Sequence, residues 1–270
     1  LHVASMGGYS DLVRFLISAK CEIHRVNDLG VTPLIVGANA GAVEIVKMLY
    51  QAKASIQIDT PTSRLAALHG AAKGGHVDVI KILHSIHSET DQPHLDINDS
   101  EGSSPLFYAA LHDRLSVVDL LCQLGCEKDD SDIRGRTALF AAAQAGHLRI
   151  VKSVCGSGCL VDKPDAQGDT PLHAAAWYGF KELCQCLLEA RCDKDPQNFQ
   201  GQTPLHYASS SGHSELVKVL CEFGSCRDSL DKECRAPIHL ATWKGHVEVL
   251  RSLCASRCDP QMANDQGWSP

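Results

Sequence analysis

One stretch decides the fold: TPLHYASSSGHSELVKVL, residues 203–220. Thr203 offers a hydroxyl that can cap a helix, and Pro204 suits the first helical turn because its missing N–H would lack a partner there in any case. Gly212 follows eight residues after the proline, the distance that a two-turn helix needs before a residue able to adopt positive φ. The apolar residues of 216–220 recur at helical spacing and indicate a second helix. The stretch therefore predicts two short helices joined by a tight turn.

The same pattern recurs along the whole chain. We call the position equivalent to Pro204 the proline slot, whether or not it holds proline. It falls at residues 33, 67, 105, 138, 171, 204, 237 and 270, and from 105 onward every interval is 33 residues. The two earlier intervals, of 34 and 38 residues, predict an insertion in each. Polar segments such as 165–169 and 198–202 separate the units and are typical of hairpin turns. A fixed period of this size is the signature of a repeat solenoid, not of a domain with one central core.

Helix, turn, helix and hairpin at period 33, with Thr-Pro-Leu-His at 170–173 and 203–206 and Gly-His at 212–213, resembles the ankyrin repeat. The resemblance covers essentially the whole chain. It implies an all-α solenoid of about eight repeats, in which helix-turn-helix units are joined by β-hairpin loops. One repeat domain is then expected over residues 1–270, with both ends cut within a repeat. The resemblance also implies that hairpins and first helices line a concave groove that binds a partner.

The composition of the chain limits the kinds of partner that it is expected to bind. Hydrophobic residues make up 44% of the chain and charged residues 21%, with a formal net charge of −7. Nucleic-acid binding usually requires a basic face, and no apolar run approaches the roughly 20 residues that span a bilayer. We therefore expect a monomer that binds another protein or a peptide segment, without nucleic-acid or direct membrane contact.

Catalytic signatures are absent from the sequence. It contains no phosphate-binding glycine-rich loop, no Gly-x-Ser-x-Gly elbow and no kinase signature. The sequence thus predicts a protein that is not an enzyme, with no catalytic residues and no cofactor.

Most of the fourteen histidines follow the repeat. The first histidine slot, directly after Thr-Pro-Leu or its equivalent, holds His2, His69, His173, His206 and His239. The second slot, directly after the helix-ending glycine, holds His76, His147, His213 and His246. The resemblance implies that both slots are structural, with hydrogen bonds to nearby backbone and hydroxyl groups. His84, His87 and His94 lie outside these slots, and a zinc site is the alternative there. Their spacing lacks the cysteine pairs of a structural zinc site, so we favour an inserted polar loop and expect no metal.

The thirteen cysteines also follow the repeat. Those 17 residues after a proline slot are Cys122, Cys155, Cys221 and Cys254, and those 21 residues after it are Cys21, Cys126, Cys159, Cys192 and Cys258. Because other repeats place Leu, Ile, Ala or Ser there, we interpret these positions as small buried packing sites. Equivalent positions in neighbouring repeats should lie about 10 Å apart, too far for a disulfide, so reduced thiols are expected. Pairs within one repeat, such as Cys122 and Cys126, are the exception.

Reduced cysteines indicate an intracellular protein, cytoplasmic or alternatively nuclear. Cys234 replaces the hairpin glycine and is expected to be the most exposed thiol. A further column at period 33 holds Asp129, Asp162, Asp195 and Asp228, where the ankyrin pattern usually has Asn. We expect these carboxylates to make local bonds to the backbone. A cation-binding ridge is the alternative, although no loop has calcium-ligand spacing.

The variable positions of the repeats carry the binding prediction. Trp177 and Trp243 fall in the same slot, six residues after the proline position, and Trp268 lies on the last hairpin. Aromatic and arginine side chains dominate interface hot spots. We therefore expect the contact surface in repeats five to eight. Its expected apolar contacts are Trp177, Tyr178, Phe199 and Trp243, and its expected charged contacts to an acidic or mixed segment are Arg134, Arg136, Arg235 and Lys244. The alternative is that the tryptophans only pack on the neighbouring hairpin or on a missing repeat.

Two functions remain open at this level. A non-catalytic scaffold or adaptor that binds a protein through the groove is favoured. The alternative is a regulatory or substrate-recruiting domain of a larger enzyme, a ubiquitin-ligase receptor or an ion channel. The repeat fold alone does not distinguish them.

Overall fold

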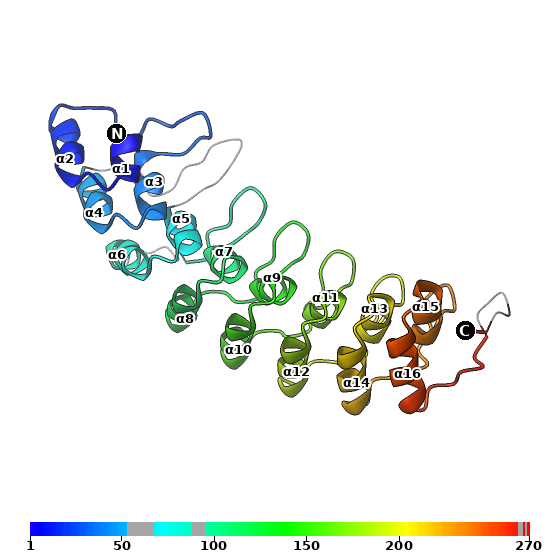
Figure 1. Cartoon of the computed structure of the whole chain (residues 1–270). Helices are drawn as coiled ribbons and strands as arrows, with labels where there is room; N and C mark the ends of the chain where they lie inside the picture. Colours follow the sequence, from blue (N-terminus) through cyan, green and yellow to red (C-terminus); the bar gives the residue numbers. More distant parts are fainter. Residues whose placement is uncertain (53–66, 88–94, 264–266, 268) are drawn as a thin grey trace. The chain divides into compact units, whose positions relative to one another are not determined.

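A computed structural model describes residues 1–52, 67–87, 95–263, 267 and 269–270. Within these residues the regular structure consists of sixteen α-helices, as the all-α prediction requires (Figure 1). None of the sixteen combines the length and the apolar character that crossing a membrane requires. The chain divides into two compact units, residues 1–133 and 134–270, which are described in turn.

Unit 1 contains four helix pairs. Their bounds are α1 His2–Met6, α2 Ser10–Ser18, α3 Pro33–Asn39, α4 Val43–Gln51, α5 Ala67–Gly74, α6 Val77–His87, α7 Pro105–Leu111 and α8 Leu115–Gln123. Each odd-numbered first helix packs on the next first helix, and the even-numbered second helices do the same. The unit therefore has two helical layers.

Unit 2 repeats this arrangement. Its helices are α9 Ala138–Ala145, α10 Leu148–Gly156, α11 Pro171–Tyr178, α12 Lys181–Glu189, α13 Pro204–Ser210, α14 Ser214–Glu222, α15 Pro237–Lys244 and α16 Val247–Ala255. First helices again contact first helices, and second helices contact second helices. The stacking confirms the predicted solenoid within each unit.

The recurring sequence motif determines where each first helix begins and ends. Every proline slot from Pro33 to Pro237 is the first residue of a first helix. Where the preceding residue is Thr or Ser its hydroxyl can cap the helix, as where the N–H of Phe140 donates to Thr137 Oγ1 at 3.1 Å. Gly179 ends α11 with φ of 74°, a left-handed conformation that glycine adopts without steric cost. The core follows from the same register, because the leucine after each proline slot is fully buried, as at Leu172 and Leu205.

The hairpins are tied by a column of Asn and Asp side chains. Each Oδ1 atom accepts N–H donors from the residues two and four positions later, which closes the turn locally. The residues are Asn27, Asp99, Asp165, Asn198 and Asp231.

Neighbouring hairpin tips are also joined by backbone bonds. In unit 2, Ala166 N donates to Arg134 O at 2.7 Å, Phe199 N to Gln167 O at 3.0 Å and Lys232 N to Gln200 O at 2.9 Å. Unit 1 has an equivalent bond from Ile133 N to Glu101 O. These bonds place each hairpin directly against the next.

Candidate partner-binding surface

Two tryptophans occupy equivalent positions on the first-helix layer of unit 2. Trp177 lies in the last turn of α11 and Trp243 in the last turn of α15, and both helices pack on α13 between them. Their exposed fractions are 50% and 73%. An exposed aromatic side chain offers apolar surface to a partner, and burying a large apolar side chain is worth about 1.5–3 kcal/mol.

Trp177 is held by groups of the next repeat. Its ring stands edge-on to the ring of Tyr207, with centroids 5.4 Å apart. His213 donates a ring N–H to the backbone carbonyl of Trp177 at 2.9 Å. The indole is therefore fixed in orientation while half of its surface stays exposed. Trp177 therefore packs in part on the next repeat, as the alternative expects. The side chain of Trp243 is mostly exposed to solvent.

Tyr207 is in turn anchored by a polar network. Its hydroxyl donates to Asp169 Oδ2 at 3.0 Å, and Asn198 Nδ2 donates to Asp169 Oδ1 at 2.8 Å. Burial, followed by the charge of Asp169, raises the pKa of Tyr207 well above its usual range. The sequence analysis missed these supporting residues. The sequence did contain a signal for them, because a tyrosine occurs three residues after the proline slot in two repeats, at Tyr108 and Tyr207. Tyr108 makes the equivalent hydrogen bond to Asp99.

The remaining predicted aromatic residues are also exposed in unit 2. Tyr178 stacks on Phe180 at 5.8 Å and is half exposed. Phe199 is 63% exposed on the hairpin tip before α13. Lys244 Nζ lies 5.5 Å from the centroid of the Trp243 ring, within the range of a cation–π interaction. We refer to Trp177, Tyr178, Phe199 and Trp243 together as the aromatic surface.

The predicted arginines differ in what they already contact. Arg235 donates to Asp231 Oδ2 from Nε at 2.9 Å and from Nη2 at 2.7 Å, and it also pairs with Glu233. This internal pairing disfavours a contact between Arg235 and a partner. Arg136 donates from Nη1 to Gln144 Oε1 at 3.3 Å, and Arg134 is exposed on the hairpin tip.

The two histidine slots make inter-repeat hydrogen bonds, as their structural interpretation requires. Nε2 atoms of four first-slot histidines bond carbonyls of the next hairpin, and those of three second-slot histidines bond carbonyls at the end of the preceding first helix. These pairs are His2–Val31, His69–Ser103, His173–Gln202, His206–Arg235, His76–Asn39, His213–Trp177 and His246–Ser210. His239 Nε2 is buried and has no hydrogen-bond partner among the described residues. In the first slot Nδ1 also accepts a backbone N–H, as in Thr203 N to His206 Nδ1 at 3.1 Å.

No group of three or more metal-ligating side chains suited to an ion occurs in the described part of the chain. His94 and the side chain of His87 lie outside that part, as does Trp268.

The aspartate column makes longer-range bonds than predicted. Asp195 Oδ1 accepts from the N–H of Cys226 at 2.9 Å, and Asp228 Oδ1 accepts from the N–H of Asp259 at 3.1 Å. Asp162 likewise accepts from Asp193, and Asp96 extends the column by accepting from Glu127. For Asp162, Asp195 and Asp228 the prediction of local bonds was wrong, because each of these carboxylates accepts from a backbone N–H of the following repeat, 31 residues on.

The prediction that the cysteines fill small buried packing positions is confirmed in part. None of the thirteen cysteines forms a disulfide, and Cys126, Cys184, Cys192, Cys221 and Cys258 are buried. Cys234 is half buried, whereas Cys21, Cys226 and Cys254 are exposed. The prediction that Cys234 would be the most exposed thiol was wrong, because its left-handed turn, with φ of 55°, keeps the residue within the hairpin.

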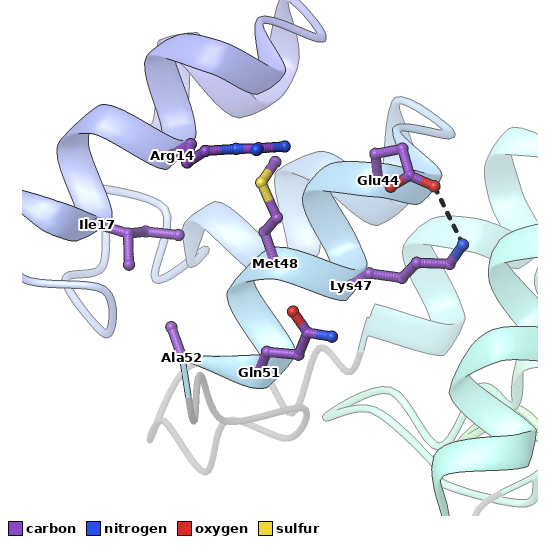
Figure 2. Close-up of a pocket in the computed structure, with 7 residues that line it drawn as sticks. All are labelled: Arg14, Ile17, Glu44, Lys47, Met48, Gln51 and Ala52. Carbon is purple, nitrogen blue, oxygen red and sulfur yellow. Dashed lines mark hydrogen bonds and ion pairs between the residues drawn. The ribbon is translucent and has the colours of Figure 1, made fainter.

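An open cavity of about 510 Å³ lies on the second-helix layer of unit 1. Figure 2 shows its lining residues from α2 and α4, with Met48 between Arg14 and Gln51. Lys47 is paired with Glu44 at 3.0 Å along the rim. None of these residues was predicted as a site residue and none is aromatic, so we assign no function to the cavity.

Comparison with known families settles what the repeat is. A family model for ankyrin repeats, in blocks of three copies, matches residues 1–60, 57–132, 124–198 and 178–264. The chain belongs to the ankyrin-repeat family. Ankyrin repeats are interaction modules that bind other proteins and are not themselves catalytic.

Curated relatives match only part of their own length. The Arabidopsis thaliana protein XBAT31, named provisionally as an E3 ubiquitin-protein ligase, is 30% identical over 46% of this chain and 29% of its own. The human ankyrin repeat and KH domain-containing protein 1 is 30% identical over 39% of this chain and 4% of its own. The Drosophila melanogaster tyrosine-protein kinase Shark is 26% identical over 31% of this chain and 9% of its own. The likeness to these relatives thus extends over less than a third of their length.

Proposed function

We propose that this protein is a non-catalytic scaffold or adaptor whose aromatic surface in unit 2 binds a segment of another protein. The observation that carries the proposal is the pair of exposed tryptophans at equivalent positions of α11 and α15. The fixed orientation of Trp177 supports it further. A side chain already held by Tyr207 and His213 loses little conformational freedom when a partner binds.

The charges beside the aromatic surface favour a partner with both acidic and apolar side chains. Arg134, Arg136 and Lys244 are the cationic residues that we assign to it, and we leave Arg235 out because Asp231 and Glu233 neutralise it. Charge-assisted contacts of this kind steer association and set specificity more than they add affinity. The overall charge of −7 is no obstacle, because recognition depends on the local field.

A library of displayed random peptides, selected on the full chain, provides the test. We expect the enriched peptides to carry Asp or Glu next to apolar residues. The Trp177→Ala/Trp243→Ala double variant should bind them at least tenfold more weakly, because loss of a hot-spot side chain costs about 2 kcal/mol or more. Isothermal titration calorimetry with one enriched peptide measures the change.

Phe223→Ala supplies the matched control. Phe223 is an exposed aromatic residue at the end of α14, in the second-helix layer, so its removal should leave peptide affinity unchanged. Equal affinity of the wild type and the tryptophan double variant, with circular dichroism showing that both are folded, would overturn the proposal. Enrichment of basic peptides would overturn its charge component.

A second candidate function is a regulatory or substrate-recruiting domain within a larger enzyme, ubiquitin-ligase receptor or channel. The relatives named as a ubiquitin ligase and a kinase favour it. Sequencing of full-length transcripts would separate the candidates by showing whether a catalytic or membrane domain shares the polypeptide.

The cytoplasmic location and monomeric state also belong to this proposal. The intracellular site is supported by the spacing of the cysteines, since equivalent positions in neighbouring repeats lie about 10 Å apart, too far for a disulfide. Light scattering of the purified chain tests the monomer.

A further inference from the structure

The first helix pair of unit 1 has apolar side chains that no neighbouring repeat covers. Its helices α1 and α2 pack on α3 and α4, and no described helix lies on the other side of the pair (Figure 1). Four large apolar side chains are exposed on this pair, and we call them together the α1–α2 face. They are Val3, Tyr9, Leu12 and Phe15. The aromatic surface of unit 2 includes none of them, so the binding proposed above does not explain their exposure.

Burial at the position of Leu12 depends on the preceding helix pair. The side chain of Leu12 is 46% exposed, whereas no equivalent residue of a later pair is more than 2% exposed. Those residues are Ile45, Val79, Val117, Ile150, Leu183, Leu216 and Val249. Val249 is buried although no described helix pair follows it, so the groups that cover this position come from the pair before. Val13, the neighbour of Leu12, is fully buried without such a pair, so only one side of α2 lacks its cover.

Tyr9 occupies a position that joins one helix pair to the next. In later repeats the equivalent side chain lies over the glycine that ends the preceding first helix. A Cβ atom added at Gly41 would lie 2.5 Å from His76 Nδ1, and one added at Gly146 would lie 2.8 Å from Phe180 Cζ. Tyr9 is exposed, because among the described residues no helix end lies beneath its ring.

The ring of Tyr9 already lies where the ring of His76 lies in its own repeat. A Cβ atom added at Gly7 would collide with the ring of Tyr9, and one added at the equivalent Gly74 would collide with that of His76. From this place His76 Nε2 bonds the carbonyl of Asn39, in the preceding pair, at 2.9 Å. The hydroxyl of Tyr9 is a donor that can make the corresponding bond. The side chain is therefore oriented for a helix end that the described residues do not supply.

We propose that the α1–α2 face is a docking surface for one further helix pair of the ankyrin type, stacked in the register of the internal pairs. The face is continuous with the interfaces that join the repeats of unit 1, and it spans both helical layers, which a single helix would not cover. The internal contacts define the chemistry of the docking pair. Its first helix ends in glycine beneath Tyr9, and its second helix presents apolar side chains to Leu12 and Phe15. Burial of these apolar groups provides the driving force.

Adding a helix pair to the full chain tests the proposal. Residues 203–237 contain α13, α14 and the hairpin that follows, and a copy of them placed directly before Leu1 brings Pro237 to the proline slot of α1. Hydrogen exchange of the extended and unextended chains is compared by mass spectrometry. We expect the amides of α2 to exchange about tenfold more slowly, or slower still, in the extended chain, because opening this pair must then also break its contacts with the added pair.

Substitutions on the face show whether the added pair makes the proposed contact. The Leu12→Ser/Phe15→Ser double variant should lose most of the gain in protection. The same double variant should change the melting temperature of the unextended chain much less, because both side chains are already exposed there. Ile133→Ser is the matched control, since Ile133 is an exposed apolar residue on a hairpin tip of unit 1, and it should leave the gain intact.

A second extension, made from residues 137–171 with α9, α10 and their hairpin, provides an independent helix pair. Failure of both extensions to add helix by circular dichroism would overturn the proposal, because a single repeat is stable only when it stacks on a neighbour. Unchanged exchange of α2 beneath a folded extension would overturn it equally. Dimerisation of the unextended chain that Leu12→Ser abolishes, measured by light scattering, would assign the face to a second copy instead. None of these outcomes depends on whether the aromatic surface binds a partner.

Discussion

At the scale of single residues, backbone conformation decides which side chains the hairpin turns accept. Gly201 has φ of 76°, and a Cβ atom added there would lie 3.0 Å from Lys232 N of the next hairpin. A Cβ atom added at Gly168 would likewise lie 2.9 Å from Phe199 N. Cys234 occupies the equivalent slot with φ of 55°. A residue with a side chain pays about 1–2 kcal/mol in this region, so the turn at Cys234 is strained relative to its neighbours.

Replacing this cysteine should relieve the strain. We predict that Cys234→Gly raises the free energy of unfolding by about 1 kcal/mol, because glycine adopts positive φ without the Cβ clash. Gly201→Cys makes the opposite change at the equivalent slot, and it should destabilise by more because the new side chain also meets backbone. Urea denaturation followed by circular dichroism measures both. A Cys234→Gly protein no more stable than the wild type would contradict the prediction.

Features that act within one turn of a helix could be predicted from the sequence, whereas several contacts between repeats could not. The capping role of Thr203 and the glycine at 179 could be predicted, since both act within one turn of a helix. The pairing of Arg235 with Asp231 was predictable from their separation of four residues but was overlooked. The contact between Trp177 and Tyr207 was not, because it depends on how one first helix is shifted along the next.

At the scale of elements, the loops after the second helices are joined by one repeated bond. Asp195 reaches from the loop after α12 to the N–H of Cys226 in the loop after α14. Asp162 and Asp228 make equivalent bonds. The position of each helix was predictable from the 33-residue period, but these bonds required knowledge of the stacking.

Asp195 provides the test of this junction. Asp195→Ala leaves the N–H of Cys226 without its acceptor and should lower the free energy of unfolding by about 1 kcal/mol. Asp195→Asn keeps an acceptor oxygen and should retain most of the stability. Thermal unfolding compares the two variants. Equal losses in Ala and Asn would show that the carboxylate charge, not the hydrogen bond, holds the loops together.

At the scale of the whole molecule, the histidines of the first slot make stability depend on pH. Burial lowers the pKa of His69, His173 and His206 below the value of about 6.5 that histidine has in an unfolded chain. Below that pH the unfolded chain binds more protons than the folded one, so stability falls as pH decreases. The contribution of these neutral imidazoles is complete above about pH 6.5 and is lost as the pH falls below it.

Removing one of these histidines should flatten the profile. We predict that His206→Gln lowers stability at pH 8 by about 1–2 kcal/mol, because the bonds to Thr203 N and Arg235 O weaken. Between pH 7 and pH 5 the variant should lose less further stability than the wild type. Urea midpoints across this range provide the measurement, and parallel profiles for both proteins would contradict the assignment.

The backbone bonds between hairpin tips in unit 2 have a direction. Each tip donates one N–H to the tip before it and offers one carbonyl to the tip after it, as at Phe199 with Gln167 and Lys232 with Gln200. A row of this kind has a donor end and an acceptor end, so a further repeat can join it in only one orientation. Every internal tip makes the same two backbone bonds, so one internal tip can replace another in the row. A block of 33 residues can therefore be duplicated or excised between such tips without leaving an unpaired donor inside the row, which gives the array a modular route to change its length.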